Sequence, residues 1–127
     1  MIGSSDYRPH LLPKLRSDQL MAAMVGYPCT IRIASFIPGE TCAHESTVVG
    51  AHLHVSGKGM GTKVTDLAVA AGCMTCHALQ ERRDPRIELI EARYPIAVTL
   101  RYAQALVETH TLLMMDGVLV VPDGNWI

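Results

Sequence analysis

Four cysteines constrain this 127-residue chain more than any other feature of its sequence. Cys73 and Cys76 form a Cys-x-x-Cys pair, and the turn Pro38-Gly39 can fold Cys42 back toward Cys29. Two thiolates at the mouth of a helix, completed by two more from another part of the chain, make a tetrahedral zinc site. We therefore predict a structural Zn²⁺ site formed by Cys29, Cys42, Cys73 and Cys76.

Other interpretations of the cysteines compete with this hypothesis. Free cysteine is among the most buried residue types, so some of the four could be ordinary core thiols. Cys73 to His77 also spells the Cys-x-x-Cys-His motif of c-type haem attachment, which requires an exported chain and leaves two cysteines unexplained. No parallel βαβ pattern precedes the pair, which disfavours a thioredoxin-like redox site.

Composition favours one domain in a reducing compartment. The first residues carry charges and two prolines in place of an apolar stretch after a basic start, so we expect no export and a cytoplasmic location. Hydrophobic residues make up 49% of the chain, enough for a core. No apolar run reaches the roughly 18 residues that a membrane helix needs. We expect a loose arm over residues 1–16 and a single zinc-bound domain over residues 17–127.

The distribution of charge limits the possible ligands. A formal net charge of −1 argues against a strongly basic nucleic-acid binder. Lysine and arginine are nevertheless confined to residues 1–33 and 52–101, so a phosphate-binding face has to come from these segments. The glycine-rich stretch from Ser56 to Lys63 matches neither the Walker A motif nor Gly-x-Gly-x-x-Gly, which gives no support to nucleotide binding of those two kinds.

Hydrophobic and turn patterns predict a mixed α+β domain. Ser17 is expected to cap the first helix, and Asp84-Pro85 is expected to start the third. The last helix is the longest, with Arg101, Gln104 and Glu108 on one face. The predicted helices cover residues 18–24, 74–83, 85–90 and 96–115, and the predicted strands cover residues 30–33, 47–54, 67–71 and 118–121.

Two histidines give this order of elements a chemical meaning. His52 lies on a predicted strand before the glycine-rich loop, and His77 follows the Cys-x-x-Cys pair on the first turn of a predicted helix. A strand with a histidine, a loop, a short strand and such a helix resemble the ββα-metal, or HNH, nuclease core. Phosphodiester hydrolysis needs a base to activate water and a divalent metal to neutralise charge. A facing strand and helix can supply both.

The sequence also resembles a specific family, the prophage-encoded YbcO nuclease family. The resemblance rests on several motifs in order, which cover about residues 26–84: Cys29 to Ile33, Glu45 to His52, Gly59 to Lys63 with Asp66, and Cys73 to His77 with Arg82 and Arg83. The long C-terminal helix also fits in type and placement. The resemblance implies an HNH-like fold with a cysteine-bound zinc and a DNA-cleaving activity.

The resemblance also implies roles for individual residues. His52 matches the first histidine of the HNH motif and would be the general base, while His77 matches the last and would bind a catalytic Mg²⁺ or Mn²⁺. Asp66 falls near the middle position and would orient the base or bind metal. One departure is Ala51, because many HNH enzymes place an aspartate ligand just before the base.

Four basic residues surround these positions in the sequence. Lys58 and Lys63 lie in the loop after His52, and Arg82 and Arg83 follow the helix that carries His77. We expect them to bind DNA phosphates. The apolar end of the last helix, residues 112–115, is a candidate homodimer surface.

The sequence leaves two alternatives to a DNA endonuclease of phage or prophage type. The first is a non-catalytic zinc module that binds DNA or a partner protein. The second is a purely structural phage or prophage protein, in which His52 and His77 would be buried and apart. All three share the cysteines, so the histidines discriminate between them.

Overall fold

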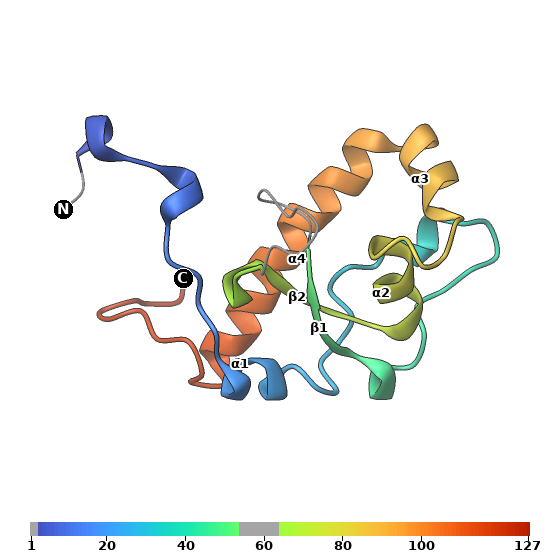
Figure 1. The fold of residues 1–127 in the computed structure, drawn as a ribbon. Helices are drawn as coiled ribbons and strands as arrows, with labels where there is room; N and C mark the ends of the chain where they lie inside the picture. The colour runs from blue at the N-terminus through green and yellow to red at the C-terminus, as the bar shows by residue number, and fades with distance from the viewer. Residues whose placement is uncertain (1–2, 54–63) are drawn as a thin grey trace.

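The computed structural model describes residues 3–53 and 64–127 (Figure 1). Short helices and a small antiparallel sheet surround one long helix, so the predicted α+β class is confirmed. The elements of the described chain are α1 (Asp18–Ala23), β1 (Val49–His52), β2 (Val69–Gly72), α2 (Met74–Gln80), α3 (Ile87–Arg93) and α4 (Pro95–Met115). Within these residues, none of the helices combines the length and apolar character that crossing a membrane requires.

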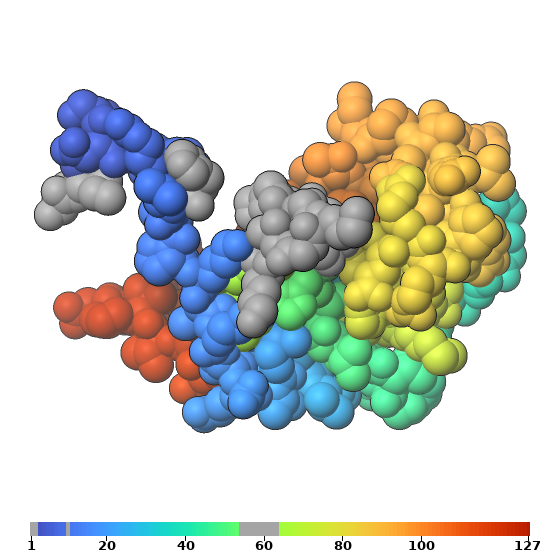
Figure 2. Space-filling model, viewed as in Figure 1, coloured from blue at the N-terminus to red at the C-terminus, as the bar shows by residue number. Residues whose placement is uncertain are grey.

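The start of the N-terminal segment extends away from the helices and the sheet (Figures 1 and 2), and hydrogen bonds to the domain begin at Leu15. It contains two short 3-10 turns, Ser4–Asp6 and Pro9–Leu11, and the first of them buries no residue. Ser17 then caps α1 as predicted, because its Oγ accepts a hydrogen bond of 3.1 Å from the Leu20 amide.

The sheet has two strands in antiparallel register. Val49 pairs with Gly72 at one end and His52 pairs with Val69 at the other. A Cβ atom at Gly72 would lie 2.6 Å from Ile31 Cδ1, so the close approach of Ile31 to the strand requires glycine there. Both strands are shorter than predicted, because the flanking residues Glu45–Thr47 and Asp66–Ala68 form 3-10 turns.

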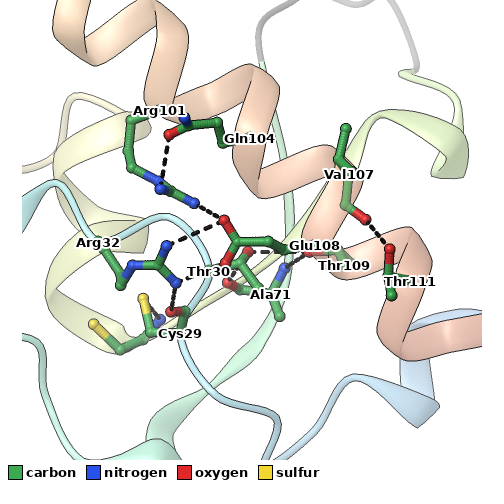
Figure 3. A network of polar contacts seen from close by, with 11 residues as sticks. Cys29, Thr30, Arg32, Ala71, Arg101, Gln104, Val107, Glu108, Thr109 and Thr111 are labelled. Carbon is green, nitrogen blue, oxygen red and sulfur yellow. Dashed lines mark hydrogen bonds and ion pairs between the residues drawn. The ribbon is translucent and has the colours of Figure 1, made fainter. Parts of the chain in front are cut away.

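A buried ring of hydrogen bonds joins α4 to the sheet (Figure 3). The Ala71 amide donates to Thr109 Oγ1 at 3.0 Å, and Thr30 Oγ1 donates to the Ala71 carbonyl at 2.8 Å. The two hydroxyl oxygens lie 3.0 Å apart, so Thr109 donates to Thr30 and every proton in the ring has an acceptor. This edge of β2 is thereby satisfied without a third strand.

Two predicted strands are absent from the described residues. Residues 30–33 bury Ile31 and Ile33 completely, but Arg32 takes a φ of +48°, which breaks extended structure and leads into a 3-10 turn. Residues 118–121 also form no strand, because the amides of Val118 and Leu119 both donate to the Leu113 carbonyl and keep the chain against the end of α4.

Two predicted helix boundaries also shift. The second helix ends at Gln80 rather than Arg83, because Arg82 adopts a φ of +64°. The third begins at Ile87 rather than at Pro85, because the Asp84 carboxylate accepts the Arg86 amide at 3.1 Å and holds a turn before the helix. The long helix was predicted at residues 96–115 and is observed at Pro95–Met115, with proline at its first position.

Candidate functional site

The four cysteines form one cluster. Their sulfur atoms all lie within 4.8 Å of one another, and Cys42 Sγ lies 3.8 Å from Cys76 Sγ. A tetrahedral zinc with bonds of about 2.3 Å places its sulfur ligands about 3.8 Å apart. Cys73 and Cys76 are buried, while Cys29 and Cys42 are partly exposed. The donor set and its spacing therefore fit a metal such as zinc.

Backbone amides hold the sulfurs in place. Cys73 is the N-cap of α2, and its Sγ accepts the amide of Cys76 at 3.5 Å. The Cys73 amide donates to Cys29 Sγ at 3.3 Å, and the Ala34 amide donates to Cys76 Sγ at 3.4 Å. Such donors stabilise thiolates and orient them, as outer-shell contacts do around metals. The start of α2 and the loop after Cys29 are thus built around the same four sulfurs.

Hydrogen bonds and burial shift the pKa values of three of the cysteines in different directions. A hydrogen bond from Cys76 overcomes burial and, with the amides of Arg32 and Cys73, lowers the pKa of Cys29 to about 4. Burial, together with charge on Cys29 and Cys73, raises the pKa of Cys42 to about 12. The hydrogen bond to Cys29 and burial also raise the pKa of Cys76. Four thiolates at this spacing need a cation, which a divalent metal supplies.

An ion-pair network ties the Cys29 loop to α4 (Figure 3). The Arg32 guanidinium donates to both carboxylate oxygens of Glu108, at 2.7 and 3.1 Å, and to the Cys29 carbonyl at 3.4 Å. Arg101 binds the same carboxylate and also Gln104, so the predicted polar face of α4 is confirmed. The Arg32 hydrogen bond is the largest of the effects that lower the pKa of Glu108. This carboxylate therefore remains charged and braces the loop.

At the other end of the sheet, the structure brings His52 and Asp66 together. His52 Nε2 lies 2.8 Å from Asp66 Oδ1. The histidine side chain is 28% exposed, whereas the aspartate is only 4% exposed. A carboxylate can only accept a hydrogen bond, so the pair places the imidazole proton on Nε2 and leaves Nδ1 as an acceptor. This arrangement can hold a histidine in the form that accepts a proton from water.

Two residues of the N-terminal segment donate hydrogen bonds to the Asp66 carboxylate. The Ser17 amide donates to Oδ2 at 2.7 Å, and Arg16 donates to Oδ1 at 3.3 Å. Burial raises the pKa of Asp66, but hydrogen bonds from His52 and Ser17 and the charges of His52 and Arg16 outweigh it, so this pKa is lower than usual. Asp66 is therefore an anion with both oxygens engaged, which suits orienting His52 better than binding a metal.

His77 contacts a carboxylate on its own helix. Its Nε2 lies 2.8 Å from Glu81 Oε1, and its side chain is 21% exposed. Burial raises the pKa of Glu81, but hydrogen bonds from Arg83 and His77 lower it by more. The pKa is therefore below its usual value, and Glu81 is charged. The pair offers one nitrogen and one oxygen to a cation. The His52 and His77 side chains are both partly exposed.

A complete second metal site does not follow from these contacts. Among residues 3–53 and 64–127, the cysteines form the one group of three or more histidine, cysteine or acidic side chains close enough to share an ion. Ala51 is fully buried, and because side chains alternate along a strand, a carboxylate at that position would face the core and not the side of His52. The described residues therefore offer Mg²⁺ or Mn²⁺ an incomplete ligand set.

The arginines expected to bind phosphate are exposed but paired. Arg82 forms an ion pair of 2.8 Å with Glu91, and Arg83 forms one of 3.0 Å with Glu81. Their side chains are 52% and 60% exposed, respectively, so these pairs are weak and exchange readily. Lys58 and Lys63, the other two residues of this prediction, lie outside the described residues.

Sequence reasoning missed two sets of partners. Glu81 lies four residues after His77 on a predicted helix, a spacing that places two side chains on one face and could have indicated the contact. Arg16 and Ser17 reach Asp66 across 50 and 49 residues of sequence, and no local pattern signals such a contact. The N-terminal segment was expected to be a loose arm, and its last residues contribute to the candidate site.

Comparison with known proteins gives one match. A family model described as "Putative nuclease YbcO" matches residues 18–111. This range includes all four cysteines, His52, Asp66 and His77, and it begins just after Ser17. No curated protein and no solved structure matches the chain.

Proposed function

Because the chain belongs to the YbcO nuclease family, we propose that it is a metal-dependent endonuclease that hydrolyses phosphodiester bonds in DNA. The observation that carries the proposal is the hydrogen bond of 2.8 Å between His52 and the buried Asp66. A partly exposed imidazole backed by a buried carboxylate is a suitable general base. The order β1, β2 and α2, with His52 on the first element and His77 on the last, supports an HNH-like core.

His52 provides the base in this mechanism. Asp66 accepts the hydrogen bond from Nε2, so Nδ1 carries no proton and can take one from a water molecule while the water oxygen attacks phosphorus. The new P–O bond forms as the bond to the leaving oxygen breaks. Asp66 stabilises the imidazolium that results, because its carboxylate remains ionised next to the positive ring.

His77 has a different role in the proposal. Mg²⁺ or Mn²⁺, held in part by His77, would neutralise charge on the scissile phosphate and the leaving oxygen. Glu81 lies beside His77 and can supply the acidic group that the strand lacks at Ala51. Replacement of His77 by alanine should therefore weaken the dependence of cleavage on the added divalent ion. Zinc bound by the four cysteines has a structural role and takes no part in the reaction.

The proposal includes several properties that follow from the sequence. Lys58, Lys63, Arg82 and Arg83 bind DNA phosphates, and the enzyme acts in the cytoplasm as a nuclease of phage or prophage type. We also propose self-association through the apolar end of α4. In that segment Met115 is 68% exposed, while Leu113 is buried in the core and unavailable to a partner.

The decisive experiment compares two histidine variants in a plasmid-nicking assay with Mg²⁺ or Mn²⁺. His52→Ala should lose about 10² to 10⁴ in rate, the usual contribution of a general base, and should retain its zinc and its fold. His44→Ala is the matched control, because His44 is exposed and caps a 3-10 turn through Ser46. It should cut as the parent protein does.

Two results would contradict the proposal. If His52→Ala nicks as fast as the parent protein in the same preparation, the cutting comes from a contaminant or from another base. If the zinc-loaded parent protein binds DNA or a partner but fails to cut DNA whichever divalent ion is added, the non-catalytic zinc module is the correct alternative.

A further inference from the structure

The N-terminal segment that precedes the family match is attached to the candidate site by four hydrogen bonds. The Leu15 amide donates to Thr65 Oγ1 at 3.0 Å, and the Asp66 amide donates to the Leu15 carbonyl at 2.9 Å. The other two run from Ser17 and Arg16 to the Asp66 carboxylate. The backbone on both sides of Arg16 is therefore fixed against the turn that carries Asp66.

This attachment determines where the Arg16 guanidinium lies. Its Nη1 and His52 Nε2 both bind Asp66 Oδ1, at 3.3 and 2.8 Å, so the cation lies next to the proposed base. The Arg16 side chain is 49% exposed. Asp66 already accepts shorter hydrogen bonds from His52 and the Ser17 amide, so the guanidinium is not its main hydrogen-bond donor. Among the residues that the structure describes, Asp66 is the one recorded hydrogen-bond partner of the guanidinium, so its other N–H groups can bind another anion.

We propose that Arg16 binds a backbone phosphate of the DNA strand that lies against His52. A guanidinium presents a planar fork that matches the oxygens of a phosphodiester, and a side chain held in place before binding loses less entropy than a free one. Arg82 and Arg83 each have a partly exposed carboxylate as a direct partner, whereas the partner of Arg16 is a buried carboxylate shared with two other donors. This assignment rests on the proposed function, because it takes the substrate to be DNA.

The test measures DNA binding without cleavage. A short fluorescent DNA duplex is titrated with the full, zinc-loaded chain in the absence of added Mg²⁺ and Mn²⁺, at several salt concentrations. Arg16→Gln should weaken affinity about 5- to 10-fold and reduce the slope of log affinity against log salt by about 1, as expected for one lost phosphate contact. Arg16→Lys should keep the slope, because it keeps the charge, and should show intermediate affinity.

Arg8→Gln is the matched control for charge on the same segment. The Arg8 guanidinium contacts the carbonyls of Ser5 and Tyr7, both at 3.0 Å and both in the N-terminal segment, so it is not directed to the candidate site. Its replacement should change the affinity and the salt slope less than Arg16→Gln does. Zinc content and thermal unfolding of each variant show whether the fold is intact.

Three outcomes would overturn the assignment. Arg16→Gln could bind DNA with the affinity and salt slope of the parent protein and lose only thermal stability, in which case Arg16 is a structural partner of Asp66. Arg8→Gln could weaken binding equally, in which case the effect is general charge. The parent protein could fail to bind the duplex. If instead binding depends on Arg16 and no variant cuts DNA, the phosphate site stands and the proposed nuclease function fails.

Discussion

The four-cysteine cluster and the His52–Asp66 pair lie at opposite ends of the same small sheet. Cys73 follows directly on Gly72, whose partner is Val49, while His52 pairs with Val69 at the other end. Strand β2 has four residues, so its two ends are only about 10 Å apart. Yet the two regions are assembled in different ways. One is suited to stabilising the fold, and the other is suited to a reaction.

The cluster at one end is closed. Its sulfurs accept backbone amides, two of its four cysteines are buried, and the loop that carries Cys29 is braced by Arg32 and Glu108. The pair at the other end is open, because His52 is 28% exposed and its Nδ1 is left without the proton that Nε2 carries. A closed set of ligands suits a structural metal, whereas an open acceptor suits a reaction with an external molecule.

Metal removal should give the largest effect and acts on the closed end. Zinc binding in sites of this kind contributes on the order of 10 kcal/mol to folding, which is comparable to the whole stability of a small domain. Cys73→Ser, or a chelator, should therefore unfold the protein under conditions in which the parent is folded. Elemental analysis and thermal unfolding measure both properties. Met74→Ala is the neighbouring control, since Met74 is 63% exposed.

An unchanged unfolding temperature in Cys73→Ser, or purified parent protein without zinc, would contradict this prediction. The cluster would then be a group of core thiols, and the contrast between a closed metal site and an open catalytic site would disappear.

The second prediction acts on the open end. Asp66→Asn should lower nuclease activity about 100-fold, the upper range for an outer-shell partner, because an amide does not fix the His52 proton on Nε2. It should also cost about 1 to 3 kcal/mol of stability, because the buried side chain loses a charged acceptor. Thr65→Ser is a suitable control, since it keeps the hydroxyl that accepts the Leu15 amide. A variant with normal activity would show that Asp66 does not orient the base.

Asp66 also makes stability depend on pH with a definite sign. Its pKa is lower in the folded protein than its ordinary value of about 3.9, so the unfolded chain binds the proton more tightly. The stabilisation is complete above that ordinary value and is lost as pH falls through the lower pKa of the folded state. The free energy of unfolding, measured between about pH 6 and pH 3, should therefore decrease less steeply with falling pH in Asp66→Asn than in the parent protein.

The closed end was more accessible to prediction from the sequence than the open end. The four cysteines are chemically distinctive, and ligand type together with the turn at Pro38-Gly39 indicated that Cys29 and Cys42 would join the Cys73–Cys76 pair despite their wide spacing. The cap at Ser17 and the start of α4 at Pro95 were also predictable, because each is a local preference of one residue type. These features depend on chemistry that a single residue carries.

What sequence did not indicate depends on contacts between ordinary residues far apart. The strand predicted at residues 30–33 fails because Arg32 adopts a positive φ, which the alternation around the buried Ile31 and Ile33 cannot reveal. The contacts of Arg16 and Ser17 with Asp66 likewise join common residues across a long stretch of chain. The partners that shape the open end were therefore invisible until the chain was folded.

The third prediction concerns the strand that links the two ends. Thr109→Val removes a hydroxyl that both accepts the Ala71 amide and donates to Thr30, so a buried amide is left without its acceptor. The cost should be about 1 to 3 kcal/mol, measured by denaturant unfolding of the zinc-loaded protein. Thr111→Val is the matched control, because the Thr111 hydroxyl donates to the Val107 carbonyl on its own helix. Equal stability of the two variants would show that the ring does not secure β2.

The smallest effect is expected at Glu108, which braces the closed end from outside. Glu108→Gln weakens its ion pairs with Arg32 and Arg101, but the Glu108 and Arg32 side chains are 37% and 44% exposed, so the loss of stability should be only about 0.5 to 1 kcal/mol. Competition with a chelator should show faster zinc loss from this variant. The reason is that the Arg32 guanidinium also contacts the Cys29 carbonyl, and the Arg32 backbone amide binds the Cys29 sulfur. Glu88→Gln, on α3, is a control that removes the same charge away from the cluster. If both variants lose zinc at the parent rate, the amides around the sulfurs hold the metal site without help from α4, and the closed end is more self-contained than its ion pairs suggest.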